Sequence, residues 1–310
     1  MDRVEGRGDV DAHEAEAWVV ATVPMVGHLE LVQAEPWASV FRATLETGIV
    51  WFKACAPHQA FEVPLTASLS ARWPATVADV LAYDIHRGWL LMADAGEPLR
   101  NLGNPPERWL EVVPAYAHLQ IGETEHAPDH LDAGVPDLRP GRLPERYGEL
   151  LGAGLPLEPA ETAALAGFHQ RFSSLCVALE DHGLGATVQH DDLHMNNVYV
   201  KAGALRVLDW GDASISHPFF SLFETFRFLT EVNRLDPGDP WFGRLRDAYL
   251  GPWGHGNTEA FDTALRIAGF SRAIAGLDQR DALPEPERPA FDEWLASILR
   301  VAMRTATATR

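Results

Sequence analysis

Two histidines, two aspartates and two asparagines lie close together in the segment VQHDDLHMNNVYV, which begins at Val188. Burying polar groups this densely costs free energy unless they have hydrogen-bond partners or bind a ligand. His190, Asp192 and Asn197 have the spacing H-x-D-L-x-x-x-N, and Asp209 follows at the end of an apolar run. This pattern is typical of phosphoryl transfer, in which one aspartate accepts a hydroxyl proton while an asparagine and a second aspartate hold magnesium. We therefore expect Asp192 to be catalytic and Asn197 and Asp209 to bind Mg²⁺.

Two charged residues upstream complete this pattern. Lys53 stands at the end of the apolar run IVWFKAC, and Glu62 follows in a segment with helical spacing of its apolar residues. Each is commonplace alone, because lysines often lie at sheet edges and helix glutamates are usually exposed. In phosphoryl-transfer enzymes, however, a lysine–glutamate pair orients the nucleotide phosphates. Because all five parts occur in the required order, we expect Lys53 to pair with Glu62 and to contact the α- and β-phosphates.

The elements that must position these residues form two groups. The first hundred residues predict a helix, three strands, a second helix and two further strands. Alternation of apolar and polar residues, with a hairpin turn at Thr47-Gly48, favours an antiparallel sheet. The expected helices cover about residues 13–24 and 58–73, and the expected strands cover residues 28–35, 39–46, 48–55, 78–86 and 89–95.

The composition changes near Gly96, where a segment rich in Gly, Pro and Asn precedes long amphipathic helices. Residues 129–144 are expected to form a loop between the first two of these helices. We therefore predict an α+β protein with two lobes: a nucleotide-binding lobe over residues 1–95, and a helical lobe over residues 96–310 with the catalytic loop and the acceptor site. A ligand cleft between the lobes is the default expectation.

The motifs resemble those of the aminoglycoside phosphotransferase and choline kinase group of small-molecule kinases. The family's catalytic loop commonly reads H-G-D-x-H-x-x-N, and the chain has HDDLHMNN from His190 to Asn197. LRVLDWGDAS is similar to the family's I-D-W-x-x-A segment, and FEVPLTASLSARWP followed by GWLLMADAGEPL resembles its helix and hinge. The resemblance extends from about Leu29 to at least Phe228. It implies a bilobal, protein-kinase-like fold with a five-stranded antiparallel sheet and one helix in the smaller lobe.

The resemblance also implies how the nucleotide binds. Adenine should form hydrogen bonds with the backbone at Ala93 and Ala95, with Met92 closing the pocket behind it. The chain has no G-x-G-x-x-G motif, so Ser39 in PWASVFRA should cover the phosphates instead. The expected cofactors are Mg²⁺ and ATP, with GTP as the alternative nucleotide.

Within the catalytic loop, His190 and His194 are expected to brace the loop by hydrogen bonds. Asp191 stands where the family usually has glycine, so we expect no positive φ at this position. Its side chain is expected to be solvated, the alternative being that it faces the acceptor. His217 and Ser221 replace two residues that are often acidic in the family.

The acceptor should be a small molecule bearing a hydroxyl group, such as an aminoglycoside, an amino sugar or choline. Glu224 is a candidate contact, as are Arg227, Glu231 and Trp241 further along the chain. Asp212 is expected either to cap the turn after Asp209 or to face the acceptor. An acidic pocket would favour an amino sugar or aminoglycoside, and an aromatic cage would favour choline; the sequence leaves both open.

The composition excludes some classes of partner. The chain has 44 acidic and 25 basic residues and a formal net charge of −19, which argues against nucleic acids and anionic membranes. It suits a cationic small molecule, although acidity also serves solubility. The two cysteines form no paired motif, and the charged first 17 residues lack the apolar core of a signal peptide. We therefore expect a cytoplasmic protein. The oligomeric state stays open.

Three alternatives compete with a small-molecule kinase. A non-catalytic nucleotide-binding relative would usually have lost one of the expected site residues. A zinc or iron hydrolase centre at His190 and His194 would need further ligands, and the sequence has no second cluster for them. A protein kinase would carry an A-P-E element after Asp209, which is absent.

Overall fold

The computed structural model describes residues 10–307. The chain divides into two compact units. The first comprises the chain up to Asn101 together with Asn196–Gly211, and the second comprises Leu102–Met195 together with the chain from Asp212 onward. The lobe boundary expected between residues 95 and 96 stays a prediction. The two compact units differ from it in one respect, because each is made of two separate stretches of the chain. The chain leaves the second unit after the catalytic loop, contributes a segment to the first unit, and then returns.

The first unit is built on a five-stranded antiparallel sheet with the strand order β1-β2-β3-β5-β4. The predicted α+β fold class, with its small antiparallel sheet, is confirmed. The sheet turn predicted at Thr47-Gly48 lies one residue earlier, because Leu45 pairs with Gly48 and leaves Glu46 and Thr47 in the turn. The strands are β1 Met25–Glu35, β2 Ala38–Leu45, β3 Gly48–Cys55, β4 Val80–Asp84 and β5 Trp89–Ala93.

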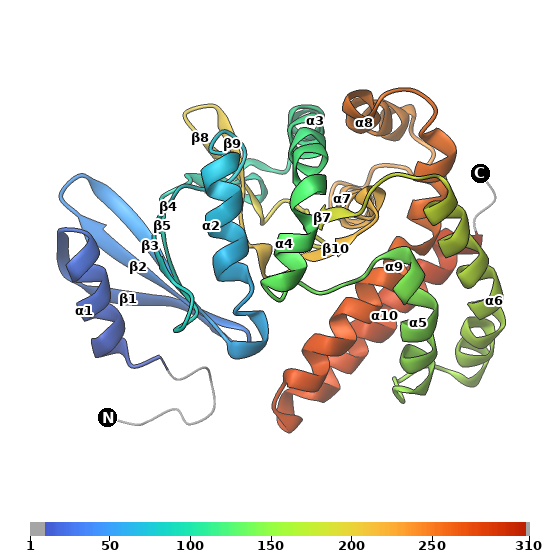
Figure 1. Cartoon of the computed structure of the whole chain (residues 1–310), viewed down its shortest axis with the longest axis horizontal. Coiled ribbons are helices and arrows are strands. Elements are labelled where there is room, and N and C mark those ends of the chain that lie inside the picture. The colour runs from blue at the N-terminus through green and yellow to red at the C-terminus, as the bar shows by residue number, and fades with distance from the viewer. Residues whose placement is uncertain (1–9, 308–310) are drawn as a thin grey trace. The chain divides into compact units, whose positions relative to one another are not determined.

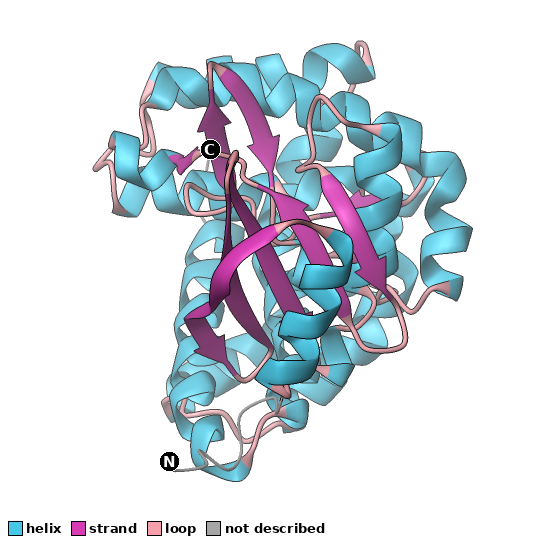
Figure 2. Cartoon of the chain, turned by 90° about the vertical axis from the view of Figure 1, so that its left-hand side faces the viewer, coloured by secondary structure: helices cyan, strands magenta, loops and turns pink. Residues whose placement is uncertain are grey.

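A helix covers each face of this sheet (Figure 1). Helix α1 (Ala12–Thr22), in front of the magenta strands in Figure 2, packs its Val19 into a core with Phe52 and Trp89. Helix α2 (Glu62–Arg72) packs Val63 against Leu90 on the other face. Side chains alternate along a strand, so Phe52 points toward α1 while Lys53 points toward α2. The alternation of side chains along β3 thereby places Lys53 beside Glu62, the first residue of α2.

A second, three-stranded sheet completes the first unit. It pairs β6 (Glu97–Pro98) with β8 (Val198–Lys201), and β8 with β9 (Ala204–Val207). Gly96 precedes β6 with φ 88°, and a Cβ there would collide with the backbone carbonyl of Val200. Glycine is therefore required at this position, both for its backbone conformation and for the close approach of β8.

The second unit is mainly helical. Its small sheet pairs β7 (Thr187–Gln189) with β10 (Ser214–Ser216) on either side of the catalytic loop in the sequence. The predicted loop over residues 129–144 is partly wrong, since it contains the end of a helix and a 3₁₀ turn at Pro140–Arg142. None of the helices in the described residues is both long enough and apolar enough to cross a membrane. The helices are α3 Pro106–Glu123, α4 Ala127–Asp132, α5 Leu143–Gly152, α6 Pro159–Asp181, α7 Leu222–Glu231, α8 Pro240–Leu250, α9 Thr258–Ala282 and α10 Arg288–Thr307.

Candidate active site

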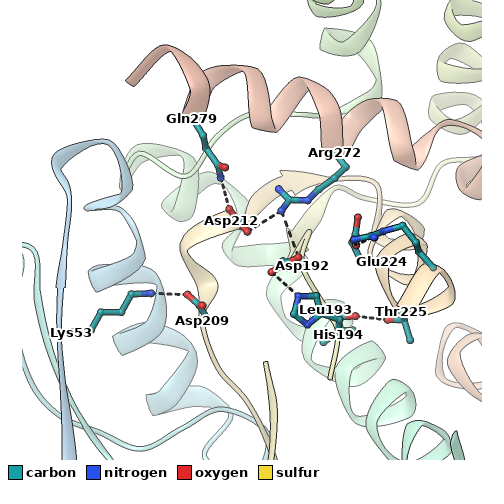
Figure 3. A network of polar contacts seen from close by, with 11 residues as sticks. Lys53, Asp192, Leu193, His194, Asp209, Asp212, Glu224, Thr225, Arg272 and Gln279 are labelled. Carbon is teal, nitrogen blue, oxygen red and sulfur yellow. Dashed lines mark hydrogen bonds and ion pairs between the residues drawn. The ribbon is translucent and has the colours of Figure 1, made fainter. Parts of the chain in front are cut away.

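In the first unit, Lys53 lies between two carboxylates. Its Nζ donates to Glu62 at 2.7 Å and to Asp209 at 2.6 Å. Figure 3 shows the contact with Asp209. Lys53 and Glu62 are buried, whereas the side chain of Asp209 is 55% exposed. The structure therefore forms the lysine–glutamate pair expected from the sequence and adds Asp209 to it. The roles of these residues in binding phosphates stay predictions.

Burial and charge act against each other on this lysine. Burial opposes ionisation, but the carboxylates of Asp209 and Glu62 raise the pKa of Lys53 well above its usual value. Burial also raises the pKa of Glu62, partly offset by the ammonium group beside it. Lys53 is therefore a permanent cation held at one place, which is what a phosphate-binding lysine requires.

The β8–β9 hairpin brings the backbone segments of the two expected magnesium ligands close together. The backbone N–H of Leu208 donates to the carbonyl of Asn197 at 2.9 Å, so Asp209 follows directly after the residue that pairs with Asn197. Asp209 has φ 63°, in the left-handed region that aspartate tolerates better than most residues.

These donors fit Mg²⁺, which prefers oxygen ligands and usually binds only one or two protein groups together with water and substrate phosphates. The half-exposed carboxylate of Asp209 leaves room for those other ligands. Within residues 10–307, no group of three or more His, Cys, Asp and Glu side chains is placed to hold a metal ion. The donor arrangement thus gives no support to a zinc or iron centre at His190 and His194.

The residues expected near adenine lie at the end of β5 and just after it. Met92 pairs with Trp51 and Val80 in the sheet. The N–H of Ala93 donates to the carbonyl of Asp79 at 2.9 Å, so the carbonyl of Ala93 would have to accept any hydrogen bond that it forms with adenine. Ala95 follows as a buried residue.

Lys201 fixes the backbone between these two alanines. Its Nζ donates to the carbonyl of Asp94 at 2.8 Å and lies 3.0 Å from the Asp94 carboxylate. At the other end of the sheet, Ser39 is the second residue of β2, opposite Ala34 and Ala54. The contacts of Ala93, Ala95, Met92 and Ser39 with a nucleotide stay predictions.

In the second unit, the carboxylate of Asp192 lies beside two side chains, the imidazole of His194 and the guanidinium of Arg272. His194 Nε2 lies 3.2 Å from one carboxylate oxygen, and Arg272 Nη2 lies 3.6 Å from the other (Figure 3). Burial opposes ionisation, but the hydrogen bond from His194 and the charge of Arg272 together lower the pKa of Asp192. Asp192 is therefore a carboxylate at neutral pH, with 22% of its side chain exposed.

Arg272 is a site residue that the sequence reasoning missed. It reaches this place from α9, is buried, and also lies 3.1 Å from Asp212. Its guanidinium packs on the ring of Trp294, 5.0 Å from the centroid. Within the described residues its Nε and Nη1 are buried without a hydrogen-bond partner. A signal exists in the sequence: Arg272 interrupts the apolar run RIAGFSRAIAGL, where a charged residue requires a partner.

Asp212 was expected either to cap a turn or to face the acceptor. Its carboxylate accepts hydrogen bonds from Arg272 and from Gln279, both on α9. Asp212 ends a short 3₁₀ turn that begins at Trp210. The carboxylate thus anchors α9 to the segment after Asp209, and a contact with the acceptor stays a prediction.

Two expectations for Asp191 are wrong. Its φ is 57°, so the position does use the left-handed conformation that glycine would provide. Its side chain is buried rather than solvated, and its carboxylate accepts a hydrogen bond from Ser214 on β10. Burial raises the pKa of Asp191 to about 6. Aspartate can stand at this position because it tolerates positive φ and finds a buried hydroxyl partner.

The catalytic loop is held by buried polar contacts. The backbone N–H of His190 donates to the hydroxyl of Tyr116 at 2.9 Å. That hydroxyl also lies 2.7 Å from Ser221, which donates to the side chain of Gln189. Ser221, which stands where the family often has an acidic residue, is therefore part of this support.

The side of the loop near Asp192 packs against α7. Thr225 donates to the carbonyl of Leu193 at 2.7 Å, and the ring of His194 lies 4.1 Å from that of Phe228. These contacts agree with a bracing role for His194, which stays a prediction. His217, the other unusual residue, is buried, and burial lowers its pKa to about 3.

Glu224 is buried on the same helix. Its Oε2 accepts from Arg227 at 2.5 Å, and within the described residues its Oε1 is buried without a hydrogen-bond partner. Burial raises its pKa, although Arg227 and Arg272 oppose the shift. Arg227 also bonds Glu231 at 3.0 Å. Glu224 therefore lies in the electrostatic surroundings of Arg272, while its contact with an acceptor stays a prediction.

The structure thus assembles two sets of residues. One set, in the first unit, holds Lys53, Glu62 and Asp209 together, with Asn197 beside Leu208. The other, in the second unit, holds Asp192 with His194, Arg272 and Asp212.

Comparisons with known proteins concern the fold. A scan against protein-family models found no match, and neither did a search of curated protein sequences. Solved structures do match. A choline/ethanolamine kinase family protein from Mesorhizobium loti has a TM-score of 0.62 at 17% identity, covering 94% of both chains. Choline kinase from Cryptosporidium parvum has a TM-score of 0.65 at 13% identity, covering 95% of both chains.

A third match is a thermostable mutant of the aminoglycoside phosphotransferase APH(4)-Ia, in a ternary complex with AMP-PNP and hygromycin B. It has a TM-score of 0.60 at 14% identity, and the match covers 96% of this chain and all of the other. The resemblance inferred from the motifs is therefore confirmed at the level of the fold: the chain has the α+β architecture of solved choline kinases and aminoglycoside phosphotransferases.

Proposed function

We propose that the protein is a Mg²⁺-dependent phosphotransferase that moves the γ-phosphate of ATP to a hydroxyl group of a small molecule. One observation carries this proposal: buried Lys53 bonds both Glu62 and Asp209. Kinases require the lysine–glutamate pair and the metal-binding aspartate to be in place together. A shared fold with kinases alone would not require these three residues to meet, because one fold hosts many functions.

Asp192 is the proposed catalytic residue. Its carboxylate orients the acceptor hydroxyl, whose oxygen attacks the γ-phosphorus while the bond from that phosphorus to the β,γ-bridging oxygen breaks. The hydroxyl proton passes to Asp192 and then to solvent, and ADP leaves. A carboxylate of lowered pKa is a weak base, which suits a loose transition state in which the proton is transferred late.

Asn197 and Asp209 are the proposed magnesium ligands. When bound, the ion neutralises charge on the nucleotide phosphates. Lys53 would orient the α- and β-phosphates. In the sequence only four residues separate Asp192 from Asn197, which limits the distance between their Cα atoms to about 18 Å. The chain itself therefore tethers the proposed catalytic residue to a proposed metal ligand. The AMP-PNP complex of APH(4)-Ia supports ATP as the donor, with GTP as the alternative.

The acceptor is proposed to carry a positive charge. Four carboxylates, those of Asp191, Asp192, Asp212 and Glu224, act on the guanidinium of Arg272, and Arg227 is a second cation that bonds one of them, Glu224. A net negative charge there would favour an amine or a quaternary ammonium group on the acceptor. The matched structures named for choline kinase and hygromycin B fit this proposal. Asp212 and Glu224 are the proposed acceptor contacts.

A coupled assay for ADP or GDP release tests the function, run with ATP and GTP against aminoglycosides, amino sugars, choline and neutral alcohols. We expect turnover with one cationic class, and loss of turnover in Asp192→Asn with nucleotide binding retained. Nucleotide binding without turnover on any acceptor would favour the alternative, a non-catalytic nucleotide-binding protein. Absence of nucleotide binding would contradict both. Turnover confined to neutral alcohols would contradict only the charge of the acceptor.

A further inference from the structure

A cavity of about 660 Å³ lies in the second unit, where it is bounded by α7, α8, α9 and α10. Its walls are mostly apolar and aromatic, so they offer a ligand contact area with few directional hydrogen bonds. The apolar lining residues are Phe223, Phe226, Phe242, Phe261, Leu265 and Val301.

Helix α7 separates this cavity from the catalytic loop. Phe223, Phe226 and Thr230 recur at helical spacing and line the cavity. Thr225, between them in the sequence, points the other way and bonds Leu193 beside Asp192. Among the described residues, no member of the proposed catalytic set lines the cavity. Two sequence candidates for acceptor contact, Arg227 and Glu231, line the cavity, but Asp192, Asp212 and Glu224 do not. The cavity is therefore distinct from the proposed phosphoryl-transfer site and goes beyond that function.

Of the residues that the structure describes, three arginines and two acidic residues line the cavity. Arg227, Arg246 and Arg304 line it, against the acids Glu231 and Asp239. The chain has only 25 basic residues and a net charge of −19, so three arginines in one cavity are a local concentration of basic side chains.

The three arginines differ in their partners. Arg227 bonds Glu224 and Glu231, and Arg246 bonds Asp247. Arg304 lies at the exposed end of α10 and forms no ion pair within the part of the chain that the structure describes. It is therefore the guanidinium that can accept an anion from outside the chain. A planar guanidinium matches a carboxylate with two parallel hydrogen bonds.

We propose that this cavity binds an alkyl carboxylate, with the aliphatic chain against the phenylalanines and the carboxylate on Arg304. The apolar lining selects the body of the ligand, and Arg304 selects the sign of its head group. Arg227 links this site to the catalytic surroundings, because it lines the cavity while it bonds Glu224.

Isothermal titration calorimetry of the full chain with hexanoate, octanoate and decanoate, in the absence of nucleotide and below micelle formation, tests the proposal. We expect affinity to rise about fourfold for each added CH₂ group. Decyltrimethylammonium and decanol have the same chain with a cationic or a neutral head group, and both should bind more weakly than decanoate. No binding of decanoate, or equal binding of decyltrimethylammonium, would overturn the proposal.

Two variants locate the site. Arg304→Gln should weaken decanoate binding by about three- to tenfold and leave decanol binding unchanged. Arg244→Gln is the matched control, since Arg244 is an exposed arginine of α8 that does not line the cavity. Equal weakening by both variants would show a general charge effect and contradict the assignment. Because Arg304 is exposed, its substitution does not depend on repacking the core.

A third variant tests the apolar part. Thr230→Trp places an indole into the cavity and should abolish binding of decanoate and decanol, with circular dichroism confirming that the chain is folded. Retained binding in the folded variant would contradict the location. The readout is independent of phosphate transfer, so the cavity proposal and the proposed function can fail separately.

Discussion

Arg272 Nη2 lies 3.6 Å from the carboxylate of Asp192, although the two residues are far apart in the sequence. The same guanidinium lies 3.1 Å from Asp212. Burial opposes its charge, but these carboxylates raise the pKa of Arg272 above its usual value. Arg272 is therefore the cation that allows several carboxylates to remain ionised in one buried place.

Replacing Arg272 should shift the pH dependence of activity. Arg272→Gln removes a charge that lowers the pKa of Asp192, so that pKa rises and the acid limb of the kcat profile moves to higher pH. Arg272→Lys keeps the positive charge but not the planar guanidinium, so we expect the acid limb to shift by an intermediate amount. The measurement is kcat from pH 3.5 to pH 8, a range that reaches the acidic region where the lowered pKa of Asp192 places this limb. An unchanged acid limb in Arg272→Gln would contradict this role for Arg272.

The same substitution should also reduce stability. Removing one partner of a buried ionic cluster typically costs about 3–5 kcal/mol, because the remaining carboxylates lose their compensation. Urea unfolding of Arg272→Gln should show a loss of this size. Arg108→Gln, which removes an exposed arginine paired with Glu111, should change stability by less than about 1 kcal/mol.

Asp191 should make stability depend on pH in mildly acidic solution. Its pKa is raised from 3.8 to about 6 in the folded chain, because burial disfavours the charged form. The folded state then binds more protons than the unfolded state between these values, so this group's contribution to stability falls as pH rises from about 4 to about 6. The full shift corresponds to about 3 kcal/mol.

Asp191→Asn tests this dependence. Asparagine tolerates positive φ, as the observed 57° requires, and it removes the titrating group. In the variant, we expect the free energy of unfolding to show no such fall between about pH 4 and about pH 6. At pH 7 the variant should be more stable than the native chain. Urea unfolding at pH 4, 5, 6 and 7 measures it. The same decline in both proteins would show that another group is responsible.

Lys53 should matter for both binding and stability. Lys53→Met leaves Glu62 buried and Asp209 without its ammonium partner, so we expect the nucleotide KM to rise and the chain to lose several kcal/mol of stability. Glu62→Gln keeps an acceptor for Lys53 Nζ and should lose less stability. Nucleotide titration and urea unfolding separate the two effects. A Lys53→Met protein with normal nucleotide affinity would contradict a role in phosphate binding.

The sequence predicted those relationships that follow from the local spacing of apolar residues along a strand or a helix. Alternation along β3 and the helical spacing after it placed Lys53 on a strand and Glu62 on a helix, and the phosphoryl-transfer pattern then predicted that they would pair. The segment VYVKAGALRVLDW, with Gly203 between two apolar runs, likewise predicts the hairpin after Asn197. Arg272 was missed because helical periodicity identifies a buried face but not the distant residue that it meets. Asp191 was mispredicted because its burial depends on Ser214 of β10, a strand pairing that no local pattern contains.

Substitutions of the two proposed magnesium ligands, Asn197 and Asp209, should differ in their effects on the Mg²⁺ requirement and on the nucleotide KM. Asn197→Asp keeps an oxygen donor and should retain part of the activity, whereas Asn197→Ala removes the donor and should raise the Mg²⁺ concentration for half-maximal rate by about tenfold or more. Asp209→Asn should do the same and should also raise the nucleotide KM, because it removes a carboxylate that holds Lys53. Rates measured across a Mg²⁺ titration at fixed nucleotide test both. If Asn197→Ala lowers kcat without changing the Mg²⁺ requirement, Asn197 positions the loop and is not a metal ligand.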